Sequence, residues 1–400
     1  MWEHLHPSDV WFELSEELSV KHLGRSWRKD AGFSAEVAAL SKLYTQRRDA
    51  IEEAERWLRA QLGFFMLRDL PKVEPALDFL AVRGLLPRGS RWRVADLGAG
   101  CGTLSLGLAR WARRHKVPCV LEVLALDRSA KALGIFEGFA RETQPPGRLE
   151  KECVPIVLIK KLCDLEMEPI EALVRGREIV FAGFVLNELR AFPSLSSEAR
   201  LGDRLEHAAE WVACALGAMA DGGLFIAIEP ALRETSRFLQ RLRGLIIERG
   251  FDVPYPCAHL GPCPLLERER DWCHAELPLK LPEPLRPIAR QAGLRFEGLS
   301  HSVLVIRKGE PRPGDPLEAT LVGGPIPMKG KVELHLCHAK GLTRVDWLWR
   351  DGDVPPFHRG SRVRTNRPLE GQRMRAVRDV QIGPGIALEG IKDDTFEAPP

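Results

Sequence analysis

Residues 94–103 read VADLGAGCGT, and this stretch decides the fold. It ends an apolar run, RWRVADL, that is typical of a buried strand, and it leads into TLSLGLARWARRH, which has the apolar spacing of a helix. Gly98, Gly100 and Gly102 allow positive φ and a close approach of the backbone at the turn. The N–H groups at the start of the following helix can face a carboxylate or a phosphate. The stretch predicts a nucleotide-type site, although a glycine-rich turn without a ligand would read the same.

The acids around this loop indicate which nucleotide it suits. The dinucleotide fingerprint G-x-G-x-x-G would need a glycine where this chain has Thr103. Instead, Asp96 stands two residues before a G-x-G-x-G run, which resembles motif I of the class I S-adenosylmethionine-dependent methyltransferases. The resemblance implies S-adenosylmethionine as the cofactor. Its ligands would be Asp96, Gly98, Ala99, Gly100, Gly102 and Thr103 in the loop, Asp127 on the ribose hydroxyls and Asp164 beside the adenine.

The rest of the chain alternates apolar strand-like runs with helical segments, and residues 294–308 read as a closing hairpin. The alternation predicts an α/β fold with a class I methyltransferase (Rossmann-like) sheet and helices on both faces. We expect a helical N-terminal region over residues 1–88 and a methyltransferase-like domain over 89–310. A cysteine-rich, metal-binding insertion would occupy 253–285. A small β-rich, basic C-terminal module would occupy 311–400, with KVELHLC as its one clear strand.

The loop after the fourth predicted strand reads FVLNEL, residues 184–189, and lies where a methyl acceptor would be held. Methyltransferases that act on exocyclic amines often carry Asn/Asp-Pro-Pro-aromatic at this place, and this loop does not. Asn187 and Glu188 are the candidate catalytic residues, because they could orient an acceptor or remove a proton. They could equally cap the following helix, and we favour that structural role.

The cysteines are concentrated in residues 254–276, PYPCAHLGPCPLLERERDWCHAE. Cys257, Cys263 and Cys273 follow a C-x5-C-x9-C spacing, and Cys337 follows downstream in KVELHLC. Four thiolates can hold a tetrahedral zinc ion or a [4Fe–4S] cluster, with His259 and His274 as alternative ligands. The other interpretation is a set of buried or free cysteines. The remaining cysteines fall on predicted strands, helices and the glycine loop, and we interpret them as packing residues.

Composition restricts the other possibilities. Nine cysteines without an export signal argue against a disulfide framework, and no apolar run is long enough for a membrane span, so a cytoplasmic location is expected. The net charge of +3 names no partner. Residues 359–378, however, hold seven arginines against one acid, Glu370. This segment is either a contact for an RNA backbone or a solvated tail.

Taken together, these features resemble a known family. PCAHLGPCPL followed by WCH, after the fifth strand of a class I methyltransferase fold, is similar to the methyltransferase-like protein family of the mitochondrial ribosomal small subunit, which has bacterial members. FFMLRDLPKVEPALDFL, FVLNEL, VELHLC and WRDGD resemble further segments of that family. The resemblance implies a [4Fe–4S] cluster on Cys257, Cys263, Cys273 and Cys337, and association with the small ribosomal subunit and its rRNA. The chain departs from the family at Ala258, where proline is usual.

Two functions follow from this reading. The first is an iron–sulfur protein that binds the small ribosomal subunit or its rRNA and assists assembly or translation, with S-adenosylmethionine as a structural or sensing ligand. The alternative is an active rRNA methyltransferase with a structural metal site, in which catalysis is mainly positioning of an acceptor. A zinc-stapled methyltransferase of proteins or small molecules would share the fold.

Overall fold

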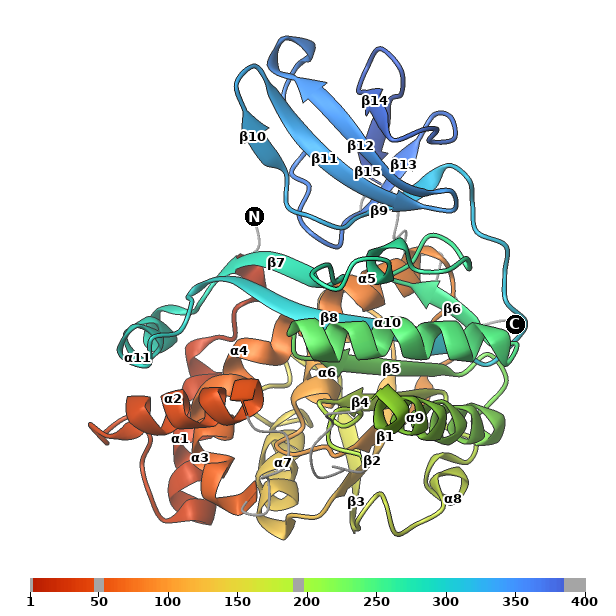
Figure 1. Ribbon diagram of the computed structural model, residues 1–400. Coiled ribbons are helices and arrows are strands. Elements are labelled where there is room, and N and C mark those ends of the chain that lie inside the picture. Colours follow the sequence, from red (N-terminus) through yellow and green to blue (C-terminus); the bar gives the residue numbers. More distant parts are fainter. Residues whose placement is uncertain (1–2, 47–53, 190–197, 385–400) are drawn as a thin grey trace.

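The computed structural model describes residues 3–46, 54–189 and 198–384, and Figure 1 shows a large sheet with helices on both faces below a smaller sheet. The large sheet is eight-stranded, in the order β3-β2-β1-β4-β5-β8-β6, with β7 paired to β8. Its strands are β1 (Arg91–Leu97), β2 (Val120–Asp127), β3 (Ile156–Leu162), β4 (Ile179–Gly183), β5 (Leu224–Glu229), β6 (Asp252–Tyr255), β7 (Ala275–Lys280) and β8 (Glu297–Arg307).

The strand directions confirm the predicted fold class. β1 to β5 pair in parallel, and β8 pairs antiparallel with β5 and β6. Every residue of the central strand β5, LFIAIE, is buried, because helices cover both faces of a parallel sheet. The chain therefore has the class I methyltransferase type of sheet, and the carboxyl ends of β1, β2 and β4 meet at one edge.

The predicted hairpin over residues 294–308 is wrong. One strand, β8, runs through this segment, and its antiparallel partners are β5, β6 and β7. The sequence LSHS in the middle of the segment offers no Asn-Gly or Gly-Gly pair, so nothing turns the chain there. β7 lies inside the cysteine-rich insertion, where the prolines concealed the strand.

Helices cover the two faces of the large sheet in separate hydrophobic cores. One core contains α1 (Asp9–Leu23), α5 (Glu74–Val82), α6 (Thr103–Arg114) and α7 (Ala130–Glu142), and the other contains α8 (Ile170–Val174), α9 (Glu198–Ala218) and α10 (Arg233–Glu248). None of the helices in the described segments has both the length and the apolar character that a bilayer-spanning helix requires.

The N-terminal region consists of helices, two of 14 and 15 residues and several of a single turn. Its further helices are α2 (Phe33–Gln46), α3 (Leu58–Ala60) and α4 (Leu67–Asp69), and a π-helix occupies Gln61–Met66. The short helix α11 (Arg286–Gln291) packs against α2. Single turns of 3-10 helix occur at Glu3–Leu5, Ala54–Trp57, Leu70–Val73, Pro264–Leu266, Glu283–Leu285 and Trp349–Asp351.

The C-terminal module contains far more strand than predicted. Its seven-stranded sheet has the order β14-β12-β11-β9-β13-β15, with β10 paired to β11, and it has its own core. The strands are β9 (Glu318–Leu321), β10 (Ile326–Met328), β11 (Lys331–His338), β12 (Gly341–Leu348), β13 (Arg362–Thr365), β14 (Arg373–Arg375) and β15 (Ile382–Pro384). Most of them have three or four residues, which is too few for a visible alternation of apolar and polar positions.

The arginine-rich segment 359–378 belongs to this sheet and is not a tail. It contributes β13 and β14, and one of its arginines, Arg362, is buried. The last part of the predicted module, residues 385–400, lies outside the described residues.

A buried ion pair within the C-terminal sheet lies where this sheet contacts the rest of the chain. Arg362 on β13 pairs with Glu318 on β9, and their exposed fractions are 7% and 5%. Arg362 also donates to the carbonyl oxygen of Pro256, 3.2 Å away, at the start of the cysteine-rich loop. Thr320 donates to the same oxygen at 2.8 Å, and Arg83 after α5 pairs with Glu318. The C-terminal sheet is thereby attached to the loop that carries the cysteines.

Replacing Arg362 by methionine should therefore lower the free energy of unfolding by about 3 kcal/mol, as when one partner of a buried ion pair is removed. Arg378 is the matched control, because its side chain is 73% exposed and lies 3.6 Å from Asp379 at the surface. Arg378→Met should cost less than about 1 kcal/mol. Denaturant unfolding measures both, and equal losses would contradict the assignment.

Candidate functional site

The glycine loop lies between β1 and α6, as predicted, and two of its glycines are required by close contacts. Gly98, Gly100 and Gly102 have φ of 62°, 51° and 86°. A Cβ atom on Gly102 would lie 2.2 Å from the ring of Phe136, and one on Gly98 would lie 2.7 Å from Val185. The loop can therefore approach α7 and the loop after β4 only without side chains at these positions.

Two predicted acids hold the glycine loop from below. Asp127 at the end of β2 accepts hydrogen bonds from the backbone N–H groups of Gly100 and Ser129, both at 2.8 Å. Asp96 is 3% exposed and accepts a hydrogen bond of 2.6 Å from the Ser105 hydroxyl on α6. Burial raises the pKa of Asp96 to about 7. Asp96 therefore ties β1 to α6, while Asp127 sets the shape of the loop.

A cleft of about 390 Å³ lies above the loop. Seven of the eight predicted cofactor residues line it; the exception is Gly102, which packs against Phe136. Asp164, beyond the end of β3, forms part of the wall and accepts the backbone N–H of Glu166 at 3.0 Å. Cys101 and Cys163, interpreted above as packing residues, also line the cleft.

The two candidate catalytic residues have different surroundings. The Asn187 side chain donates to Glu229 on β5 at 2.5 Å, and the backbone N–H of Leu186 donates to the same carboxylate at 2.9 Å. Asn187 therefore fixes the loop to β5, and it does not cap α9, which begins at Glu198. Glu188 lines the cleft, where burial raises its pKa to about 7. Of the pair, Glu188 is the residue that can contact a ligand.

One wall of the cleft was missed by the sequence analysis. It comes from the N-terminal helices and includes Tyr44, Gln61, Phe65, Arg68, Asp69 and Lys72. Asp69 and Lys72 are buried and lie 2.9 Å apart. Burial lowers the pKa of Lys72 to about 8. The signal was present in FFMLRDLPKV, where three charged residues interrupt an apolar run, but nothing in the sequence directs them to the glycine loop.

The four predicted cysteine ligands meet at a second, small pocket of about 50 Å³. Cys257, Cys263 and Cys273 come from the loop between β6 and β7, and Cys337 comes from β11 of the C-terminal sheet. Burial raises the pKa of Cys273, and the thiols of Cys257 and Cys263 raise it further. Burial and its three cysteine neighbours raise the pKa of Cys337 well above its ordinary value. Three half-buried thiols of the loop and one buried thiol of the C-terminal sheet therefore share one pocket.

Side chains of α10 hold the cysteine loop in place. Gln240 donates to the Cys263 sulfur at 3.1 Å, and Arg243 donates to the Gly261 carbonyl at 2.9 Å. Arg237 donates to several loop carbonyls, among them those of Arg268 at 2.8 Å and Asp271 at 2.7 Å. Prolines have no backbone N–H, so few backbone donors are available within this loop. The arginine side chains therefore supply the hydrogen bonds that its carbonyl groups need.

The two histidines of the loop lie beside the sulfurs. The Nε2 atom of His259 is 3.3 Å from the Cys337 sulfur, and burial lowers the pKa of His259 to about 4. His274 has its Nδ1 atom 3.2 Å from Arg359, and burial lowers its pKa to about 4 as well. Both rings are therefore neutral at pH 7, and His259 is placed to hydrogen-bond the sulfur of a ligand cysteine.

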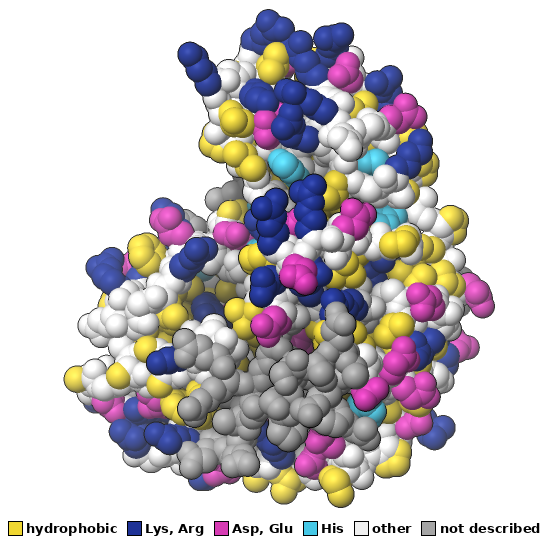
Figure 2. Space-filling model, viewed as in Figure 1, with side chains coloured by type: hydrophobic (Ala, Val, Ile, Leu, Met, Phe, Trp, Pro, Cys, Tyr) yellow, Lys and Arg dark blue, Asp and Glu magenta, His cyan; other side chains and the backbone are white. Residues whose placement is uncertain are grey.

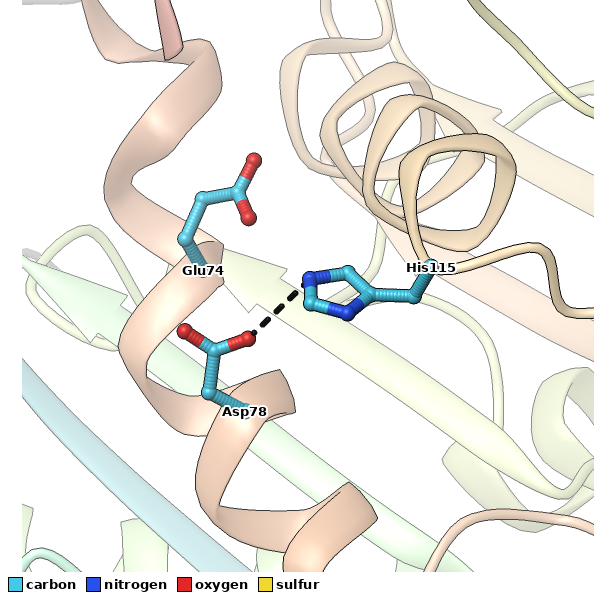
Figure 3. A group of neighbouring side chains, drawn as sticks. All are labelled: Glu74, Asp78 and His115. Atoms are coloured by element: carbon cyan, nitrogen blue, oxygen red, sulfur yellow. Dashed lines mark ion pairs between the residues drawn. The ribbon is translucent and has the colours of Figure 1, made fainter. Parts of the chain in front are cut away.

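A separate group, Glu74, Asp78 and His115, brings ligand-type atoms together between α5 and the end of α6 (Figure 3). His115 lies 3.4 Å from Asp78, which also accepts the Trp111 indole N–H at 2.8 Å. Glu74 pairs with Arg114. Because this arginine already neutralises Glu74, we assign the group to the contact between the two helices and not to a metal ion.

The comparison with family models matches residues 93–359 to the family described as "Mitochondrial small ribosomal subunit Rsm22". The match includes the glycine loop, the cleft loop and all four cysteines of the pocket. The chain belongs to the Rsm22 family. Its similarity to a family of the small ribosomal subunit agrees with the resemblance stated from the sequence, whereas the cytoplasmic location stays a prediction, since the family description is mitochondrial.

Solved structures similar to this Rsm22-family chain include methyltransferases. Magnesium protoporphyrin IX methyltransferase from Synechocystis PCC 6803 is 14% identical, with 70% of this chain and 100% of that chain covered and a TM-score of 0.33. A putative class I S-adenosylmethionine-dependent methyltransferase from Listeria monocytogenes is 9% identical over 75% and 87% of the two chains, at 0.35. Likenesses of this size say nothing about activity or substrate. No curated protein matches the sequence.

Buried acids around the cleft predict a pH dependence of stability. Burial raises the pKa of Glu229 to about 8, from an ordinary value of 4.5. A carboxyl whose folded-state pKa is raised contributes stability below its unfolded-state pKa and loses it as pH rises through the folded-state value. Thermal unfolding should therefore move to lower temperature between pH 5 and about pH 8, and Glu229→Gln should flatten this fall.

The matched control is Glu248→Gln, which changes an exposed glutamate at the end of α10. It should leave the slope of melting temperature against pH unchanged. If Glu229→Gln keeps the wild-type slope, Glu229 is ionised in the folded protein at neutral pH and the assignment is wrong.

Proposed function

We propose that this Rsm22-family chain is an iron–sulfur protein that binds the small ribosomal subunit and its rRNA and assists assembly or translation, with S-adenosylmethionine in the cleft. The observation that carries the proposal is the convergence of Cys257, Cys263, Cys273 and Cys337 on one small pocket. Cys257, in the loop after β6 of the large sheet, and Cys337, on β11 of the C-terminal sheet, are 80 residues apart in the chain. A group bound to all four would fasten the C-terminal sheet to the cysteine loop.

The spacing of the sulfurs favours a cluster over a zinc ion. Among the described residues, the only three His, Cys, Asp or Glu ligand atoms within 4.8 Å of one another belong to Glu74, Asp78 and His115. No three of the four cysteine sulfurs are therefore that close. Two sulfurs on one tetrahedral zinc ion would be about 3.8 Å apart, from a Zn–S distance of about 2.3 Å. Ligands at the four corners of a [4Fe–4S] cluster bind different irons and lie further apart.

The cleft suits S-adenosylmethionine by shape and by hydrogen bonding. Asp127 stands at the carboxyl end of β2 with its carboxylate at the cleft wall, where it can accept from ribose hydroxyls. Around Gly100 a Cβ atom would meet nothing within 4 Å, so the backbone there is open to a ligand. Asp164 lies at the side where the adenine is expected. When bound, the cofactor supplies an activated methyl group on a sulfonium ion.

The C-terminal sheet is the proposed RNA contact. Residues 311–384 contain 13 Lys and Arg against 8 Asp and Glu, an excess of 13 − 8 = 5 positive charges, whereas the whole chain has +3. Figure 2 shows Lys and Arg side chains gathered over this part of the molecule. Trp349, directly after β12, is 48% exposed and offers a ring for stacking. Basic side chains beside an aromatic ring suit single-stranded RNA.

An active rRNA methyltransferase is the second candidate, and Glu188 is the observation that favours it. Its carboxyl lines the cleft with a pKa near 7, which suits a group that accepts a proton from an amine at neutral pH. In this case the acceptor nitrogen would take the methyl group, the cofactor would leave as a thioether, and Glu188 would take the proton.

The assembly role predicts that loss of one cysteine of the pocket disconnects the C-terminal sheet. Cys263→Ser should lower the melting temperature of anaerobically purified protein and weaken its co-sedimentation with small ribosomal subunits. Cys214→Ser is the control, because Cys214 lies on α9 outside the pocket. Unchanged co-sedimentation of Cys263→Ser would contradict the role assigned to the pocket.

The cofactor assignment predicts that Asp127→Ala weakens S-adenosylmethionine binding about tenfold or more, the scale of one or two charge-assisted hydrogen bonds. Calorimetric titration measures the affinity. Asp221→Ala is the control, because the Asp221 side chain is fully exposed before β5, away from the glycine loop. Equal affinities of the Asp127 variant and the wild type would remove Asp127 from the site.

A further inference from the structure

The backbone is strained at the end of the cleft that faces the N-terminal helices. Phe184, directly after β4, has a φ of 61°. A bulky residue in this conformation is a genuine outlier and persists only where the surrounding structure imposes it. Its backbone N–H is fixed by a hydrogen bond of 2.8 Å to the Ile228 carbonyl on β5, and the residue lines the cleft.

A second irregular segment reaches the same place. The π-helix Gln61–Met66 widens the N-terminal helix for six residues and brings Gln61, Phe65 and Met66 to the cleft wall. π-Helices are rare and occur frequently at functional sites. Gly63 permits this one, because a Cβ atom there would lie 2.6 Å from the ring of Trp27. Two uncommon backbone conformations thus serve one end of one cleft.

Aromatic rings and cations form the surface that results. The rings of Tyr44 and Phe184 have their centroids 6.3 Å apart, and those of Tyr44 and Phe65 are 6.1 Å apart. The Lys72 ammonium group lies 4.8 Å from the centroid of Phe184, and the Arg68 guanidinium lies 4.7 Å from that of Phe65. Burying Lys72 is costly, and its carboxylate partner, Asp69, is shared with Arg68. A purely structural core would gain nothing from such charges.

The polar groups at the Phe184 end of the cleft can form hydrogen bonds with the edge of a flat ligand. Gln61 donates to the Tyr44 hydroxyl at 3.3 Å, so the edges of the rings are polar. The Glu188 carboxylate also lines the cleft, where the positive charge of Arg128 acts on it. A carboxylate accepts hydrogen bonds from exocyclic amines, while ring faces and a guanidinium stack on a base. An apolar lipid or an aliphatic side chain would use none of these groups.

We propose that the Phe184 end of the cleft binds an unpaired, amine-bearing nucleobase of RNA, with the Phe184 ring as its stacking surface and Glu188 at its amine edge. This inference rests on the proposed function, because it takes RNA as the partner. It adds to that function a binding site for one base, which would turn out of the RNA strand and enter the cleft beside S-adenosylmethionine. The strained backbone at Phe184 is then explained as the means of presenting the ring.

The test uses a short single-stranded RNA that contains 2-aminopurine, whose fluorescence is quenched on stacking. The full chain with its metal centre, saturated with S-adenosylmethionine, should quench the probe. Phe184→Gly should weaken the quenching interaction about tenfold or more, as expected for loss of one stacking ring. Because glycine adopts a φ of 61° without strain, this variant should melt no lower than the wild type. A merely structural ring would instead lower the melting temperature when removed.

A second variant and a control separate the outcomes. Tyr44→Leu should weaken the quench in the same direction, and Glu248→Gln, at the exposed end of α10, should leave its amplitude unchanged. If wild-type protein binds the cofactor but does not quench the probe, or if Phe184→Gly quenches as well as the wild type, the base site is refuted while the proposed function stands. If the wild type fails to bind S-adenosylmethionine in calorimetry, the proposed function fails first, and quenching without cofactor still decides the base site.

Discussion

The contact between the α10 arginines and the carbonyl groups of the cysteine loop is the interaction on which the rest of the structure depends. The loop from Pro256 to His274 is rich in proline, so it cannot form a helix or an inner strand and must obtain hydrogen bonds from side chains. Arg237 and Arg243 provide them and press the loop onto α10. Three cysteines are thereby brought opposite Cys337, and the C-terminal sheet is brought against the large sheet.

The cleft and the cysteine pocket are both lined by residues of strand β8. On β8, Ser300 lines the cleft and Ser302 lines the cysteine pocket, where its hydroxyl is 2.6 Å from that of Ser236 on α10. A change in the cysteine pocket therefore bears on β8, which also lines the cleft. This arrangement gives a physical route by which metal content could alter ligand binding, and it is consistent with a factor whose competence depends on cluster supply.

Sequence patterns predicted the features that are local and strongly repeated. Strands β1 to β5 were found because their apolar runs are long. The glycine loop was found because no other residue type fits at Gly98 and Gly102, where a Cβ atom would clash, so the sequence must carry glycine there. The four cysteines were found because sulfur is rare and clustered here. The C-terminal strands were missed because they are short, and the hairpin was wrong because β7 is hidden among prolines. The aromatic wall was missed because Tyr44 and Phe184 come together only through long-range packing.

The central claim is that three cysteines of the loop after β6 and one of the C-terminal sheet hold one iron–sulfur cluster, and the most direct test is chemical. Iron and acid-labile sulfide should be counted per chain, with an absorbance spectrum, on protein purified without oxygen. The account predicts roughly four irons and four sulfides per chain and absorbance near 400 nm, as for a [4Fe–4S] cluster. One zinc ion per chain without sulfide would contradict it and would make the pocket a structural zinc site.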